Sequence, residues 1–237
     1  MNRLLHILII LALLWPGFSE AALSKVFFGS NTQDGLFDTV TLTFDSTGYT
    51  HVVCFVKHEG TPTTITESDN KGSGAYNLLT KVDHSNGDLS SRLMWVKIGT
   101  PGASHTVTVT YGSGRLYSRL ACWGINATSG DIELDVQATN QGTGTAVDAG
   151  SLATTTATVS FMGTGEYSSV TYTPGTGWTE DLDSAIHGQS RADSSGTLDP
   201  ACTASGSMDW TANAASFREL GGGGSVVNKL MLIGVGP

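Results

Sequence analysis

The stretch Y-T-H-V-V-C-F-V-K-H-E-G, residues 49–60, contains the densest apolar run outside the N-terminus. Apolar residues occupy every position from 52 to 56, and Gly48 and Gly60 bound the run. A short apolar, β-branched run between turn residues is typical of a strand that is buried on both faces. We therefore expect residues 51–58 to form a central strand of the core.

Other segments alternate apolar and polar residues, which is the pattern of half-buried strands. The clearest are F-D-T-V-T-L-T-F at 37–44 and T-V-T-V-T at 106–110, and Gly-rich turns separate the segments. No window has sustained apolar spacing of helical period. The sequence predicts an all-β fold: a two-sheet antiparallel β-sandwich, jelly-roll-like, with about a dozen strands and almost no helix in the mature chain.

A single β-sandwich domain is expected over residues 22–220. Residues 221–237 follow as a Gly-rich hinge and an apolar C-terminal segment. The two halves of the domain share a similar order: an apolar strand, an aromatic-led segment, a strand containing Arg92 or Arg191, and a long strand. This echo indicates a duplicated strand order within one sandwich.

The N-terminus has the pattern of a secretory signal peptide over residues 1–21. A basic start precedes an apolar run at 4–15, then Pro16 and Gly17, and a small-residue site that predicts cleavage after Ala21. The apolar run is shorter than the ~20 residues that span a bilayer, so a membrane anchor is the less favoured alternative. We expect a secreted, extracellular protein with no membrane insertion after cleavage; the periplasm or a cell surface are the other destinations.

The charge of the chain limits its partners. The formal net charge is −9, and only 14% of residues are charged. An acidic surface disfavours binding to nucleic acid and to anionic lipid, because both repel it.

Three cysteines bear on the compartment: Cys54, Cys122 and Cys202. In an oxidising compartment, three cysteines predict one disulfide and one free thiol. Cys54 and Cys122 both lie in apolar strand segments, so we expect this pair to be bonded. The alternative is that both are small buried core residues.

The order of segments resembles a known module. H-V-V-C-F-V-K-H-E-G is followed by S-D-N-K-G-S-G-A-Y-N-L-L, S-R-L-M-W-V-K and H-T-V-T-V-T, and then by the strand at 115–125. This order is similar to a β-sandwich module of unassigned role in bacterial exported proteins and phage-associated structural proteins. The resemblance covers residues 40–220 and implies a fold and a compartment, with no active site to transfer.

One strand contains a partial enzymatic motif. G-D-I-E-L-D-V-Q at 130–137 is similar to the catalytic strand of laminarinase-like jelly-roll glycosidases, which implies Glu133 as nucleophile and Asp135 as the assisting carboxylate. The position of the acid/base glutamate is Ala138, and retaining chemistry needs two carboxyl groups. We expect these carboxylates to be the solvent side of an edge strand, and no enzymatic activity.

Metal sites are not expected from the histidine spacing, because no H-x-x-x-H or H-E-x-x-H pattern occurs. The run E-S-D-N-K-G at 67–72 resembles the start of a calcium loop, but Lys71 occupies a ligand position. A tight turn capped by Asp69 and Asn70 is the favoured reading, and a calcium ion stays open as the alternative.

The strongest binding signal is aromatic. G-E-Y-S-S-V-T-Y-T-P-G-T-G-W-T-E-D mixes rings with loop formers and acids. Rings on loops beside carboxylates are typical of glycan-binding jelly rolls, and we expect a ligand site at Tyr167, Tyr172, Trp178, Glu180 and Asp181. The alternative is that Trp178 packs into the end of the sandwich.

Three functions follow, in order of preference. The first is a secreted non-catalytic protein that binds a cell-surface ligand of glycan type. The second is a self-assembling structural subunit of a filament, matrix or virion surface, because the apolar segments at 26–28 and 226–235 are flanked by glycine and can add to a neighbour's sheet edge. The third is a glycosidase that uses Glu133 and Asp135.

Overall fold

A computed structural model describes residues 23–60, 64–115, 117–156, 158–167, 170–184, 186–193 and 195–220. The signal-like residues 1–21 and the segment 221–237 lie outside this range. In the described residues the chain is all β, with seventeen strands in four antiparallel sheets and no helix. The all-β antiparallel prediction is therefore confirmed, with more strands and more sheets than expected.

The first half of the chain forms two sheets. Sheet A has the order β1 (Ser24–Gln33), β9 (Ser118–Asn126), β3 (His51–Glu59), β7 (Leu89–Lys97) and β5 (Asn77–Leu78), and β6 (Val82–Asp83) also pairs with β7. Sheet B has the order β2 (Phe37–Phe44), β8 (His105–Arg115) and β4 (Ile65–Asp69).

The second half forms the other two sheets. Sheet C has the order β10 (Ile132–Asp148), β17 (Ala201–Glu219), β12 (Thr158–Glu166), β15 (Ile186–Asp193) and β14 (Thr179–Asp183), and β13 (Tyr172–Pro174) also pairs with β17. Sheet D pairs β11 (Leu152–Thr154) with β16 (Gly196–Leu198).

The two halves repeat one strand order. In each large sheet the first strand of the half pairs with the last, and the last pairs with the third. The third then pairs with the strand two places before the last, which gives β1-β9-β3-β7 in sheet A and β10-β17-β12-β15 in sheet C. In the first half β8 pairs with both β2 and β4. In the second half two strands take the place of β8: β16 pairs with β11, and the start of β17 pairs with β13. Each half thus has the strand order of a jelly roll, and the duplication extends over two sandwiches.

The four sheets stack in the order B, A, C, D, with a hydrophobic core in each gap. Val52, Cys54 and Val56 of β3 face the core between sheets B and A. Val53 and Phe55 face the core that sheet A shares with sheet C. We expected residues 51–58 to form a strand that is buried on both faces. They do, because β3 is central in a sheet that is covered on both sides.

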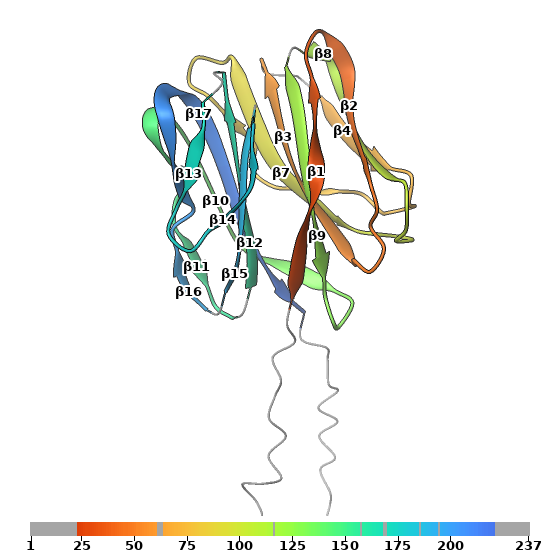
Figure 1. The fold of residues 1–237 in the computed structure, drawn as a ribbon. Coiled ribbons are helices and arrows are strands. Elements are labelled where there is room, and N and C mark those ends of the chain that lie inside the picture. Colours follow the sequence, from red (N-terminus) through yellow and green to blue (C-terminus); the bar gives the residue numbers. More distant parts are fainter. Residues whose placement is uncertain are drawn as a thin grey trace, which may run out of the picture.

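Small residues in sheet C make room for the rings of sheet A. A Cβ added to Gly163 would overlap the ring of Phe55, and one on Gly188 would lie 2.8 Å from Cζ2 of Trp123. Interiors are close-packed, so the rings of Phe55 and Trp123 fit against sheet C because these two positions carry no side chain. This interface holds the rolls side by side (Figure 1).

The chain enters and leaves at one end of the molecule. The start of β1 and the end of β17 both point to the lower end in Figure 1, while the β1–β2 and β8–β9 turns lie at the upper end. We call the upper end the distal end. Within the described residues it lies opposite the start of β1 and the end of β17.

Candidate functional site

Exposed apolar side chains gather at the distal end. Large hydrophobic residues that are exposed in the described part of the chain are Leu36, Phe37, Leu78, Tyr117, Tyr167 and Leu220. Leu36 and Phe37 lie at the β1–β2 turn, Tyr117 at the β8–β9 turn, and Tyr167 directly after β12. We call these four residues the distal tip. Exposed apolar clusters on soluble proteins mark interaction sites more often than isolated apolar residues do.

Arg119 ties two segments of the distal tip together. Its Nη2 lies 2.6 Å from Oδ1 of Asp34, and its Nη1 donates to the carbonyl oxygen of Gln33 at 3.1 Å. Its guanidinium carbon lies 5.9 Å from the centre of the Tyr117 ring, within the range of a cation–π contact. The β1–β2 turn is thereby fixed against the β8–β9 turn.

Lys57 links Tyr167 to the same group. It opposes Arg119 in the register of β3 and β9, and its Nζ lies 5.7 Å from the centre of the Tyr167 ring. The Tyr167 hydroxyl donates to the carbonyl oxygen of Asp88 in the turn before β7. Side chains from both jelly rolls therefore meet at the distal tip.

Buried charges lie beneath these rings. Lys57 and Glu166 are each 2% exposed, and Lys57 Nζ lies 3.7 Å from Oε1 of Glu59. Burial lowers the pKa of the Lys57 ammonium, and burial raises the pKa of the Glu166 carboxyl to about 8. The floor of the distal tip is consequently polar, and its Glu166 carboxyl favours the protonated form near neutral pH.

Tyr117 has an unusual backbone conformation. Its φ is 50°, in the left-handed region that residues other than glycine rarely adopt. Such a conformation costs about 1 kcal/mol or more and persists only when the surrounding structure holds it. Here it places an aromatic ring at the tip of the β8–β9 turn, 43% exposed.

The predicted aromatic site is dispersed in the structure. Tyr172 and Trp178 are each 6% exposed, in the core between sheets C and D. Trp178 Nε1 donates to the carbonyl oxygen of Asp199 at 2.9 Å, and the Tyr172 ring stacks on His187 with centroids 4.6 Å apart. Trp178 is therefore a packed core residue, which agrees with the alternative that it packs into the sandwich.

The remaining predicted residues lie apart from one another. Asp181 accepts a hydrogen bond of 2.8 Å from Trp123 Nε1, and Glu180 is exposed on the edge strand β14. Glu180 and Met162 both pair with Gln189, so Glu180 lies beside the middle of β12. Tyr167 lies beyond the end of β12 and is therefore distant from Glu180 along the sheet. Of the five predicted residues, Tyr167 alone belongs to the distal tip.

Sequence reasoning missed Leu36, Phe37, Tyr117, Lys57 and Arg119. Phe37 begins a segment that alternates as a strand does, and Lys57 lies inside the central run at 51–58, so neither has the local pattern of an exposed site. The signal that was present is the apolar pair at 36–37 directly after a glycine, since turn segments are usually polar.

Glu133 and Asp135 share one cation. Arg218 Nε lies 2.6 Å from Oε1 of Glu133, and its Nη1 lies 3.4 Å from Oδ1 of Asp135. Asp135 also accepts hydrogen bonds from the backbone N–H and hydroxyl of Thr155. These contacts are those of an ion-pair cluster that joins β10 to β17.

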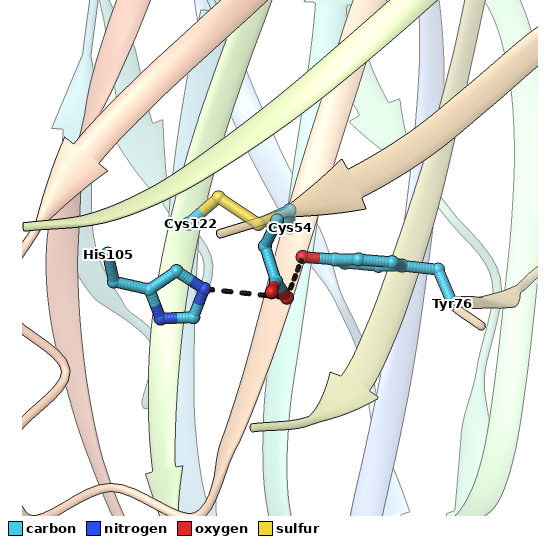
Figure 2. The surroundings of a disulfide bond; sticks show 5 residues. Cys54, Tyr76, His105 and Cys122 are labelled. Carbon is cyan, nitrogen blue, oxygen red and sulfur yellow. Dashed lines mark hydrogen bonds and ion pairs between the residues drawn. A yellow bond between two sulfur atoms is a disulfide. The ribbon is translucent and has the colours of Figure 1, made fainter. Parts of the chain in front are cut away.

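The oxygen-rich segment at 67–72 comprises the end of β4 and the turn that follows it. The side chains of Tyr76 and His105, which both contact Asp69, lie near the Cys54–Cys122 disulfide (Figure 2). Asp69 Oδ1 accepts from the backbone N–H of Lys71 at 2.8 Å, while Asp69 Oδ2 accepts from the Tyr76 hydroxyl at 3.2 Å and lies 3.5 Å from Nε2 of His105. Burial opposes ionisation of Asp69, but hydrogen bonds from Ser73 and Lys71 lower its pKa below the ordinary value. These contacts are those of a turn capped by a side chain, and both carboxylate oxygens of Asp69 have protein partners.

The disulfide itself joins Cys54 to Cys122, which oppose each other on the adjacent strands β3 and β9. Both residues are fully buried between sheets A and B, and Cys202 is a buried free thiol. In the described part of the chain, His, Cys, Asp and Glu form no group of three that could hold a metal ion. That part also contains no helix with the length and apolar character needed to cross a membrane.

Comparison with protein-family models finds no match for this chain. Comparisons with the curated proteins and with the solved structures also find no significantly similar protein. Functional inference therefore rests on the residues themselves.

Proposed function

We propose that this chain is an exported, non-catalytic β-sandwich protein that binds a surface ligand of glycan type through its distal tip. The observation that supports it is the gathering of exposed rings from three separate turns at the end opposite the start of β1 and the end of β17. A binding end that lies far from the chain ends stays free when the termini are attached to something else.

The chemistry of the distal tip suits a sugar. The faces of Phe37, Tyr117 and Tyr167 supply apolar surfaces against which the C–H faces of pyranose rings pack. The Asp34 carboxylate, and the guanidinium with which it pairs, can exchange hydrogen bonds with sugar hydroxyls. The net charge of −9 disfavours nucleic acid and anionic lipid as ligands.

Export is part of the proposal. Residues 1–21 have the composition of a signal peptide. The Cys54–Cys122 disulfide is weak additional support, since disulfides persist mainly in oxidising compartments. The resemblance to modules of exported and phage-associated proteins agrees with this destination.

Binding to a glycan array, followed by calorimetric titration of the mature chain with the best oligosaccharide, tests the proposal. We expect Tyr167→Ala and Tyr117→Asn each to weaken binding about 10-fold or more, a loss of about 1.4 kcal/mol. Asparagine is chosen at position 117 because it tolerates positive φ, so the ring is removed without a new backbone penalty.

The matched control is Leu78→Ala, because Leu78 is 44% exposed, close to the 43% of Tyr117, but lies on β5 outside the distal tip. The control should bind as the wild type does. Absence of glycan binding across the array, or equal weakening by Leu78→Ala, would contradict the proposal.

A further inference from the structure

Among the described residues, the longest edge strand is β10. It stands at the end of sheet C, and all fifteen of its register pairs are with β17. The opposite edge of that sheet is β14, with only five residues. A strand that is paired on one side alone presents a row of free backbone N–H and C=O groups on its other side.

This edge has few of the usual protections. Residues 136–147 read V-Q-A-T-N-Q-G-T-G-T-A-V, with no charge and no proline. Bulges interrupt the register between Leu134 and Val136 and between Gly144 and Ala146, so the nine residues between them form a regular template. Natural edges normally carry Lys, Pro or very short strands, which prevent other chains from pairing.

The counterpart edge in sheet A is built in the same way. The first strand of that half, β1, has ten residues, and Asn31 Nδ2 donates to the carbonyl oxygen of Thr41 in β2. In the second half Asn140 Nδ2 donates to the carbonyl oxygen of Asp148, and Thr155 donates to Asp135, so the segment after β10 returns beside it. The two edges are topologically equivalent, and β10 differs from β1 in its greater length.

The sequence contains a segment that suits this edge. Residues 226–235, V-V-N-K-L-M-L-I-G-V, lie outside the described structure and are joined to Leu220 by four glycines and a serine. The run is rich in β-branched and aliphatic residues, which favour strands. Added beside β10, it would bring apolar side chains next to Val136 and Ala138, which are only partly buried on the face toward sheet D.

We propose that the segment 226–235 of a second copy of this chain adds as a strand to the outer edge of β10. A chain's own segment is less suited to that place. The loop before β10 closes the direct path, since Ser129 N–H donates to Glu219 and Leu220 N–H donates to the Asp131 carbonyl. If the chain reversed direction after β17 and paired with the β10 of the same copy, it would run parallel to β10. Parallel pairing is slightly less stable than antiparallel pairing.

The assembly is tested by sedimentation equilibrium of the mature full chain over a wide concentration range. We expect concentration-dependent oligomers. The double variant Leu230→Pro/Leu232→Pro should raise the dissociation constant at least 10-fold, because proline cannot donate to the ladder. Leu230→Val/Leu232→Val keeps the apolar, strand-forming character and should still assemble.

A second pair of variants tests the edge. Asn140→Lys places a charge on the exposed part of β10 and should also raise the dissociation constant at least 10-fold, while Thr32→Lys on the exposed part of β1 should leave it unchanged. A full chain that is monomeric at every concentration contradicts the inference. So does an oligomer that survives Asn140→Lys, or one that Thr32→Lys dissociates. Glycan binding by the distal tip is measured separately, so either proposal can fail alone.

Discussion

Cys54 and Cys122 sit in the middle of the core between sheets A and B, with no exposed surface. Their disulfide closes a loop of 68 residues, and the loss of chain entropy in the unfolded state predicts a contribution of about 4 kcal/mol. We expect the double variant Cys54→Ala/Cys122→Ala to lose about this much free energy of unfolding in urea denaturation. Cys202→Ala, which removes a buried thiol but no disulfide, is the control. Equal stability of the double variant and the control would contradict the prediction.

Glu166 makes stability depend on pH. Burial raises its pKa from 4.5 to about 8 in the folded protein, against the charges of Lys57 and Arg119, so folding favours the protonated acid. The stability linked to this group is complete below the unfolded pKa and is lost as pH rises through about 8. Glu166→Gln mimics the protonated acid, so the wild type should be similar to it in acid and less stable by a few kcal/mol in alkali. Denaturation curves of both proteins across this range provide the measurement. A stability difference that does not change with pH would show that Glu166 is not the titrating group.

At the residue scale the sequence predicts environment poorly where distant contacts decide it. Trp178 and Tyr172 stand among glycines, threonines and acids, a composition that indicates an exposed loop. They are buried because Asp199 and His187, which are distant in sequence, complete their surroundings. Tyr167 has the same local composition and stays exposed, since β12 ends just before it.

Gly163 lets β12 approach β3 at the element scale. A methyl group there would overlap the Phe55 ring, and both strands are central in their sheets, so neither can move aside freely. We expect Gly163→Ala to reduce the free energy of unfolding by about 1–3 kcal/mol. Gly74→Ala, at a site where an added Cβ would meet nothing within 4 Å, should change it little. Urea denaturation of the two variants compares them directly, and equal effects would argue against the close approach.

Strand periodicity predicted the elements unevenly. The run at 49–60 identified β3 as central because only a strand covered on both faces is apolar at successive positions. The long strand β17 runs from Ala201 to Glu219, whereas its polar first third gives no strand signal in the sequence. Pairing with β10 and β13 stabilises that part, and such long-range pairing has no local signature. The similar order of segments in the two halves predicted a duplicated strand order, which the sheets show. Patterns along the chain do not tell whether two repeats share one sandwich or form two.

The whole molecule should unfold as one unit. The core between sheets A and C takes residues from both jelly rolls, including Phe55, Trp123, Phe161 and Phe217. Separation of the rolls would expose these rings, so one roll does not unfold without cost to the other. We expect a single calorimetric transition with a van't Hoff enthalpy close to the calorimetric enthalpy. Two resolved transitions would mean that the rolls are independent domains.

Ligand binding at the distal tip can be tested by chemical-shift mapping of the ¹⁵N-labelled mature chain. On titration with an oligosaccharide selected from the array, the largest amide shifts should fall at residues 34–37, 117, 119 and 167, on turns that only the fold brings together. Residues 172–181, which contain the other four residues of the site that the sequence predicted together with Tyr167, should shift little because Tyr172 and Trp178 are buried. Shifts confined to 172–181, or no shift at the distal tip, would contradict the account.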